Sequence, residues 1–151
     1  MYNTKAERTK DLEDMDKAIE HCRTAVNLSA QAPMYSIGGM QNLANGYLER
    51  YHTSNNTDDL RSAAELANQI VDMALKQGLR RTETLADAAS IMQENYLYTK
   101  DAGELRKATL WMKEAVSLLQ PTATTVSAVY LTYGCILEEN FKLKRSEEAL
   151  E

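Results

Sequence analysis

The chain has 151 residues, 44% of them hydrophobic and 26% charged, and it carries a formal net charge of -5. This length is enough for one domain with a buried core, and the apolar fraction argues against disorder throughout. No run of Lys and Arg exceeds two residues, and no apolar run approaches the roughly 20 residues that a membrane-spanning helix needs. The sequence therefore argues against nucleic acid and membrane as partners and predicts a cytoplasmic protein.

Apolar residues recur at spacings of three and four in six segments, which predicts six helices. In chain order they are 11–28, 35–53, 58–76, 82–99, 103–119 and 124–143. Gly78 follows the third helix, where a left-handed cap is expected, and Asp101 with Glu104 forms a capping-box pair before the fifth. Gly38 and Gly39 each cost about 1 kcal/mol relative to Ala inside a helix, so we expect the second helix to start late or to fray.

Similar residues return at steps of 45 along the chain. Leu60 and Leu105 share such a column with Met15 and Leu150, because 15, 60, 105 and 150 differ by 45. The sequence predicts one array over residues 1–151, with periods at about 11–33 (second helix only), 34–78, 79–121 and 122–151 (incomplete). We interpret the chain as cut from a longer array, with 145–151 starting a further helix.

Within each period, two helices carry a recurring motif. The first-helix columns hold Met40, Leu43, Ala44 and Tyr47; Leu85, Ala88, Ala89 and Met92; Tyr130, Tyr133, Gly134 and Leu137. The second-helix columns hold Ala18, Cys22 and Ala25; Ala63, Ala67 and Ile70; Ala108, Met112 and Ala115. Small residues at these places let paired helices approach closely while larger ones interdigitate.

This pattern resembles the tetratricopeptide repeats, whose usual period is about 34 residues. The resemblance implies an all-α fold, a right-handed α-solenoid of antiparallel helix pairs. The residues by which the 45-residue period exceeds the usual one amount to whole helical turns, so the buried faces stay in phase. This predicts longer helical hairpins with the same packing. Such long repeats resemble the arrays of fungal multidomain proteins that carry nucleotide-binding oligomerisation or caspase-like modules. A HEAT-type solenoid is the alternative by length, but the small-residue motif argues against it.

The sequence does not predict an enzyme. His21 and Cys22 are adjacent, so on a helix they point about 100° apart and cannot form a nucleophile–base pair. His52 is best explained as a residue that caps the end of a helix. No phosphate loop, nucleophile elbow or metal-binding motif is present, so we expect neither a catalytic residue, a cofactor nor a metal.

The resemblance implies that a partner meets the first helix of each pair, on the concave face of the array. The partner-binding candidates there are polar and acidic: Gln41, Asn45, Glu49, Glu83, Asp87, Ser90, Glu94, Thr132, Cys135, Glu138 and Glu139. The carboxylate clamp of some relatives is incomplete, since only Asn45 matches it, so a basic or amide-rich peptide is the expected ligand.

Two readings of the expected function remain open. The first is an interaction module, a scaffold or sensor segment that binds a protein or peptide and has no chemistry of its own. The second is a structural element of a larger intracellular signalling protein that associates end to end with its own copies. At the residue level, Glu49, Glu94 and Glu139 either contribute to binding or only solvate a helix end.

Overall fold

The computed structural model describes residues 5–29, 32–120 and 124–150, and in these ranges the chain is all-α, without a strand. Its six helices are α1 (Lys5–Leu28), α2 (Pro33–Ser54), α3 (Thr57–Lys76), α4 (Thr82–Thr99), α5 (Ala102–Ser117) and α6 (Val126–Glu148). All six predicted helices are present, and the bounds predicted for α4 coincide with the observed ones. The all-helical prediction is therefore confirmed.

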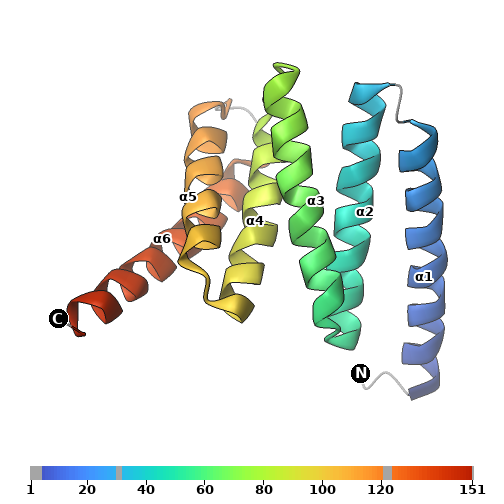
Figure 1. The fold of residues 1–151 in the computed structure, drawn as a ribbon, viewed down its shortest axis with the longest axis horizontal. Coiled ribbons are helices and arrows are strands. Elements are labelled where there is room, and N and C mark those ends of the chain that lie inside the picture. The colour runs from blue at the N-terminus through green and yellow to red at the C-terminus, as the bar shows by residue number, and fades with distance from the viewer. Residues whose placement is uncertain (1–4, 30–31, 121–123, 151) are drawn as a thin grey trace. The chain divides into compact units, whose positions relative to one another are not determined.

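The helices form two compact units, Met1–Lys76 and Gln77–Glu151. In the first unit, α2 packs against both α1 and α3 (Figure 1). In the second unit, α5 packs against both α4 and α6, and α4 also contacts α6. Each unit thus consists of three consecutive helices in which the middle helix contacts both of its neighbours.

The predicted late start of α2 was wrong, because the helix begins at Pro33, ahead of both glycines. Tertiary packing accounts for one of them: a Cβ on Gly39 would lie 3.2 Å from Val26 Cγ2 of α1. A Cβ on Gly46 would likewise lie 3.2 Å from Ile19 Cγ1 of α1. The glycines let α1 and α2 approach closely, and this packing offsets their low helix propensity.

The ends of α2 and α4 share one geometry. Asn55 and Lys100, which are 45 residues apart, both adopt a left-handed conformation with φ of 58° and 60°. Each amide N–H donates to a carbonyl four residues earlier, on Tyr51 and Tyr96 respectively, at 2.7 Å. The left-handed cap predicted at Gly78 is confirmed, with φ of 66°.

The third residue of this column, Arg145, stays helical, and α6 continues to Glu148. The prediction that 145–151 starts a new helix was therefore wrong for 145–148, and residue 151 lies outside the described ranges. Two contacts within the helix support the continuation: the Arg145 guanidinium lies 5.9 Å from the Phe141 ring centroid, and Lys144 pairs with Glu148.

The predicted capping box at α5 is only half formed. Asp101 Oδ1 accepts a hydrogen bond from the Gly103 amide at 2.7 Å, as a capping residue should. The Glu104 carboxylate instead turns to α4, where it accepts hydrogen bonds from Asn95 and Thr99. The helix start is thus capped on one side only, and Glu104 ties α5 to the end of α4.

The small residues of the second-helix motif lie in the core on α3 and α5. Ala63 and Ala67 on α3 and Ala108 and Ala115 on α5 are completely buried. On α1, the equivalent Ala18 and Ala25 are exposed and Cys22 is only half-buried, whereas Ile19 is buried. The expectation that the whole motif is core therefore holds for α3 and α5 but not for α1.

Candidate functional site

The predicted partner-binding residues divide between the two units. Gln41, Asn45 and Glu49 lie on α2 in the first unit; Asn45 and Glu49 are exposed and Gln41 is half-buried. The other candidates lie on α4 and α6 in the second unit: Glu83, Asp87, Ser90, Glu94, Thr132, Cys135, Glu138 and Glu139.

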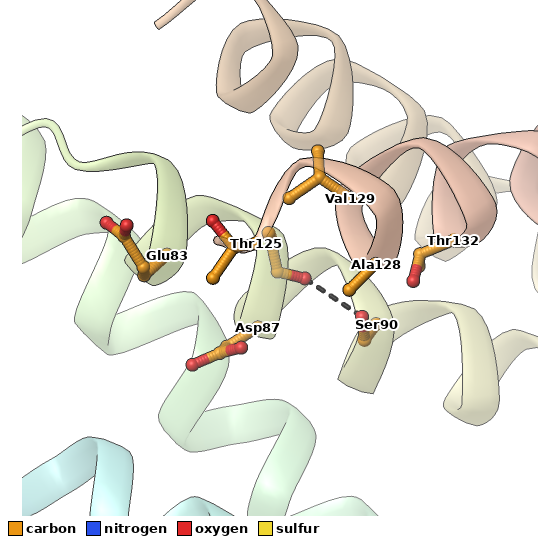
Figure 2. Close-up of a pocket in the computed structure, with 8 residues that line it drawn as sticks. Glu83, Asp87, Ser90, Thr125, Ala128, Val129 and Thr132 are labelled. Carbon is orange, nitrogen blue, oxygen red and sulfur yellow. Dashed lines mark hydrogen bonds between the residues drawn. The ribbon is translucent and has the colours of Figure 1, made fainter. Parts of the chain in front are cut away.

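Four of the predicted residues line one pocket between α4 and α6 (Figure 2). Glu83, Asp87 and Ser90 come from α4, and Thr132 comes from α6. The three α4 residues follow one another at spacings of four and three residues, so they share one face of the helix. The cavity has a volume of about 110 Å³, the scale of a single side chain rather than of a larger ligand.

Sequence reasoning did not select the remaining lining residues, Ala86, Thr125, Ala128 and Val129. Three are small or apolar, and they form the part of the wall that carries no charge. Thr125 precedes α6 directly, and no motif pointed to it.

The pocket is electrostatically acidic. The Asp87 side chain remains exposed to solvent by area, yet the protein around it displaces enough water to raise the pKa of its carboxyl above the usual 3.8. The negative charge of Glu83, one turn earlier on α4, raises this pKa further. Both causes disfavour the charged form of Asp87, and the attraction of a cation placed between the two carboxylates would offset them.

Two hydroxyl groups add hydrogen-bonding capacity. Ser90 Oγ donates to the Ala86 carbonyl at 3.0 Å, as the dashed line in Figure 2 shows, which leaves the oxygen lone pairs able to accept. Thr125 Oγ1 is buried, and no hydrogen-bond partner for it lies among the residues that the structure describes. The pocket therefore presents carboxylate and hydroxyl oxygens, a set that suits an ammonium or guanidinium group.

The α6 candidates Glu138 and Glu139 already have a partner. Lys142 Nζ lies 3.0 Å from Glu138 and 2.8 Å from Glu139, and these two bonds raise the pKa of Lys142 to about 12. Any ligand of these carboxylates must compete with that lysine. Cys135 is exposed and free, and neither it nor the two glutamates lines the α4–α6 pocket.

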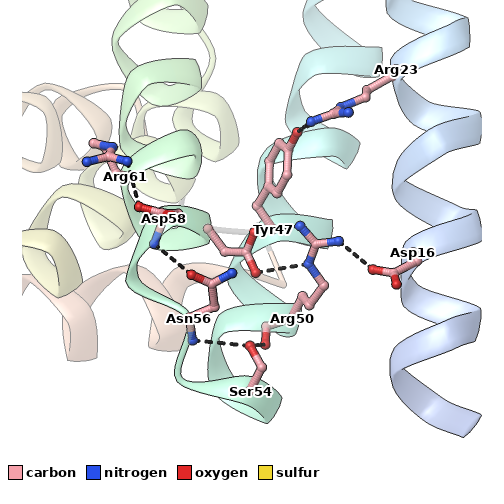
Figure 3. Close-up of polar contacts among 9 residues, drawn as sticks. Asp16, Arg23, Tyr47, Arg50, Ser54, Asn56, Asp58 and Arg61 are labelled. Atoms are coloured by element: carbon pink, nitrogen blue, oxygen red, sulfur yellow. Dashed lines mark hydrogen bonds and ion pairs between the residues drawn. The ribbon is translucent and has the colours of Figure 1, made fainter. Parts of the chain in front are cut away.

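A second polar cluster, in the first unit, was missed by sequence reasoning (Figure 3). Arg50 of α2 donates two hydrogen bonds to the buried Asp59 of α3, from Nε at 2.9 Å and Nη2 at 2.6 Å. A third, from Nη1, reaches Asp16 of α1, and the Arg23 guanidinium donates to the Tyr47 hydroxyl. The two carboxylates raise the pKa of Arg50, so the cluster joins three helices through a permanently charged group.

The repeat could have revealed this cluster. Residues 95 and 104 lie one period after residues 50 and 59, and there Asn95 donates to Glu104, as Arg50 does to Asp59. Each pair joins the end of one helix to the start of the next. A donor column and an acceptor column thus recur with the 45-residue period.

Neither metal nor membrane chemistry is indicated by the residues that the structure describes. Among them, no group of three or more His, Cys, Asp or Glu side chains could hold a metal ion. In the same ranges no helix combines the length and the apolar character needed to cross a bilayer. His52 lies in the last turn of α2, as predicted, with its ring 5.6 Å from that of Tyr51.

No model of a protein family matches the chain, and no curated protein or solved structure is significantly similar to it. The 45-residue columns and the geometry of the two units are therefore the basis for any functional argument.

Proposed function

We propose that the chain is a protein–protein interaction module of the tetratricopeptide type, a scaffold or sensor segment without catalytic activity. In this proposal its partner is a basic segment of a protein, which places a Lys or Arg side chain in the α4–α6 pocket. The single observation that carries it is the convergence of Glu83, Asp87, Ser90 and Thr132 on one small acidic pocket. A cytoplasmic location and a solenoid arrangement of the repeats belong to the same proposal.

The chemistry of the pocket favours a cation over an anion. Asp87 is already costly to ionise because of partial desolvation and the neighbouring Glu83. An acidic peptide would add a further negative charge, whereas a guanidinium would pair with both carboxylates and donate further hydrogen bonds to the hydroxyl oxygens. The small volume fits one long side chain with its polar end, so specificity would reside in a single anchor residue.

The direct test is competition between labelled peptides, followed by fluorescence anisotropy. We expect a Lys/Arg-rich peptide to displace an acidic peptide of equal length and its affinity to fall with added salt. Asp87→Asn and Glu83→Gln should each weaken binding roughly fivefold, which corresponds to about 1 kcal/mol. Glu65→Gln, a change of equal charge on the exposed side of α3, is the matched control and should have no effect.

Binding should also depend on pH in a defined direction. Because the pKa of Asp87 is raised, its carboxylate takes up a proton at a higher pH than an ordinary aspartate does. The attraction for a cation is therefore present at neutral pH and is lost as the pH falls through that raised pKa. Equal, salt-insensitive binding of the basic and acidic peptides would contradict the proposal.

A second candidate function, self-assembly, has an observation of its own. Large apolar side chains on α6 are exposed, among them Leu131 and Phe141, and the motif residues Ala18 and Ala25 on α1 are exposed as well. Exposed apolar faces of this kind favour association. A solution mass that rises with protein concentration would support this candidate, independently of any peptide binding.

A further inference from the structure

The exposed face of α6 is a face that its counterparts bury. Helices α2, α4 and α6 carry the same columns at steps of 45 residues, and in α2 and α4 these columns are buried except at Tyr51, which is half-buried. On α6 they are open: Tyr130 is 55%, Leu137 46% and Phe141 61% exposed. The buried counterparts on α2 and α4 are Met40, Tyr47, Leu85, Met92 and Tyr96.

Helix α1 has the complementary open face. In α3 and α5 the alanine column at Ala63 and Ala108 is completely buried, whereas the equivalent Ala18 is exposed. The neighbouring side of α1, about 100° around the helix from Ala18, is occupied, because Ile19 is buried and approaches Gly46 of α2. The open side of α1 is therefore the side that α3 and α5 bury.

A polar pair defines how two such faces would meet. Arg50 bonds Asp59 across α2 and α3, and Asn95 bonds Glu104 across α4 and α5. The next donor position, 45 residues after Asn95, is Asn140 of α6. The matching acceptor position, 45 residues before Asp59, is Asp14 of α1.

Both of these residues are accessible for a new contact. Asp14 is exposed, and its ion pair with the exposed Lys17 is long, at 3.6 Å, so that breaking it costs little. Asn140 is half-buried at the contact with α5, where its amide donates to Thr109 Oγ1 at 2.8 Å and to the Ile136 carbonyl at 2.9 Å. Both amide hydrogens are thus in use, so Asp14 would replace Thr109 Oγ1 as the acceptor of one of them when α1 docks.

Charge supports this pairing over part of the two helices. Beyond Asn140, α6 carries Lys142, Lys144 and Arg145 followed by Glu147 and Glu148, whereas the α1 segment around Asp14 carries Asp11, Glu13 and Asp16 together with Lys17. In an antiparallel pair, the end of one helix lies beside the start of the other. With Asp14 beside Asn140, Lys142 and Arg145 would then lie near Asp11, where opposite charges attract, and Lys142 would exchange its pairs with Glu138 and Glu139 for this contact.

We propose that α1 of one copy docks antiparallel on α6 of a second copy, with Asp14 beside Asn140, in the manner of the α2–α3 and α4–α5 pairs. This inference rests on the self-assembly candidate and supplies its contact. The two faces differ, so the contact is head-to-tail and each pair keeps one open α1 and one open α6. Wild-type protein therefore grows into chains longer than a dimer.

Two blocking variants test the contact by light scattering and analytical ultracentrifugation. Ala18→Arg blocks the α1 face and Leu137→Asp blocks the α6 face, and each variant alone should remain at the mass of one chain, 17.0 kDa. An equimolar mixture still contains one open α1 and one open α6. It should form a dimer of twice 17.0 kDa and nothing larger, whereas the wild-type mass keeps rising with concentration.

Folding and register are checked separately. Both substituted side chains are exposed, so circular dichroism should show unchanged helix content, and Glu65→Arg on α3 is the control that leaves assembly intact. Asp14→Arg alone should weaken assembly, and Asn140→Asp in the same chain should restore it by creating an opposite-charge pair. Restoration supports the register; a double variant no better than Asp14→Arg overturns it.

The remaining outcomes separate the contact from the candidate function. A rising wild-type mass combined with a monomeric mixture of the two blocking variants overturns the α1–α6 contact while self-assembly stands. A wild-type mass that stays at one chain up to millimolar concentration overturns both, and it leaves the α6 face to a helix of another protein. Peptide binding at the α4–α6 pocket is unaffected by either result.

Discussion

At the scale of single residues, the first unit contains a buried carboxylate, Asp59, that is paired with a single arginine of the neighbouring helix. It accepts two hydrogen bonds from Arg50, and only 4% of its side chain is exposed. Removing one member of a buried pair leaves the other without compensation, so this contact is costly to break even where forming it contributes little.

We expect Asp59→Ala to lower the free energy of unfolding by about 2 kcal/mol, less than for a fully buried pair because Arg50 keeps Asp16 and is partly exposed. Urea unfolding followed by circular dichroism measures the loss. Asp58→Ala is the matched control: it removes the neighbouring aspartate, whose pair with Arg61 is exposed on both sides, and should cost less than about 1 kcal/mol. Equal losses would show that burial of Asp59 is unimportant.

At the scale of helices, the two adjacent glycines of α2 differ in their surroundings. A Cβ added at Gly38 meets nothing within 4 Å, whereas one at Gly39 lies 3.2 Å from Val26 Cγ2. We expect Gly38→Ala to raise the unfolding free energy by roughly 0.5–1 kcal/mol, the gain in helix propensity. Gly39→Ala should gain less or lose stability, because Val26 must move. Thermal unfolding of both variants makes the comparison, and equal gains would contradict the tight α1–α2 contact.

The same helices show what could be read from the sequence. Apolar spacing located all six helices, and the 45-residue columns identified residues such as Ala63 and Ala108 that pack in the core. The spacing could not report that Glu104 turns to Asn95, because the choice between a cap and an interhelical hydrogen bond depends on what lies opposite. The sequence prediction ended the sixth helix at residue 143, whereas α6 continues to Glu148. Nothing in the local sequence breaks the helix at Arg145, so the repeat pattern alone was a poor guide to its end.

The candidate site was predictable for a related reason. Glu83, Asp87 and Ser90 are each about one helical turn apart. Their shared face on α4 therefore follows from helical geometry. On the α6 side of the pocket, only Thr132 was predicted. Thr125 and Val129 line the pocket because α6 packs against α4, which the sequence does not show. Contacts between helices that are not adjacent in the chain have no pattern in a single sequence.

At the scale of the whole molecule, burial is uneven along the chain, and local stability should follow it. Buried residues are numerous on α3 and α4, whereas only Ile19 is buried on the described part of α1, and only Val129 and Ile136 on α6. Helices with one open face lose less buried surface when they open locally, so their backbone amides exchange with solvent sooner. We therefore expect the first and last helices to be the least protected parts of the structure.

Hydrogen exchange followed by mass spectrometry tests this profile. In dilute wild-type protein, peptides from α1 and from the C-terminal half of α6 should exchange faster than peptides from α3 and α4. In concentrated protein, docking of α1 on α6 buries both open faces, so exchange should slow in these two helices and stay unchanged in α3 and α4. The Ala18→Arg variant should lose this concentration dependence. Slowing that spreads evenly over all helices, or that persists in the variant, would mean that the contacts between copies lie elsewhere.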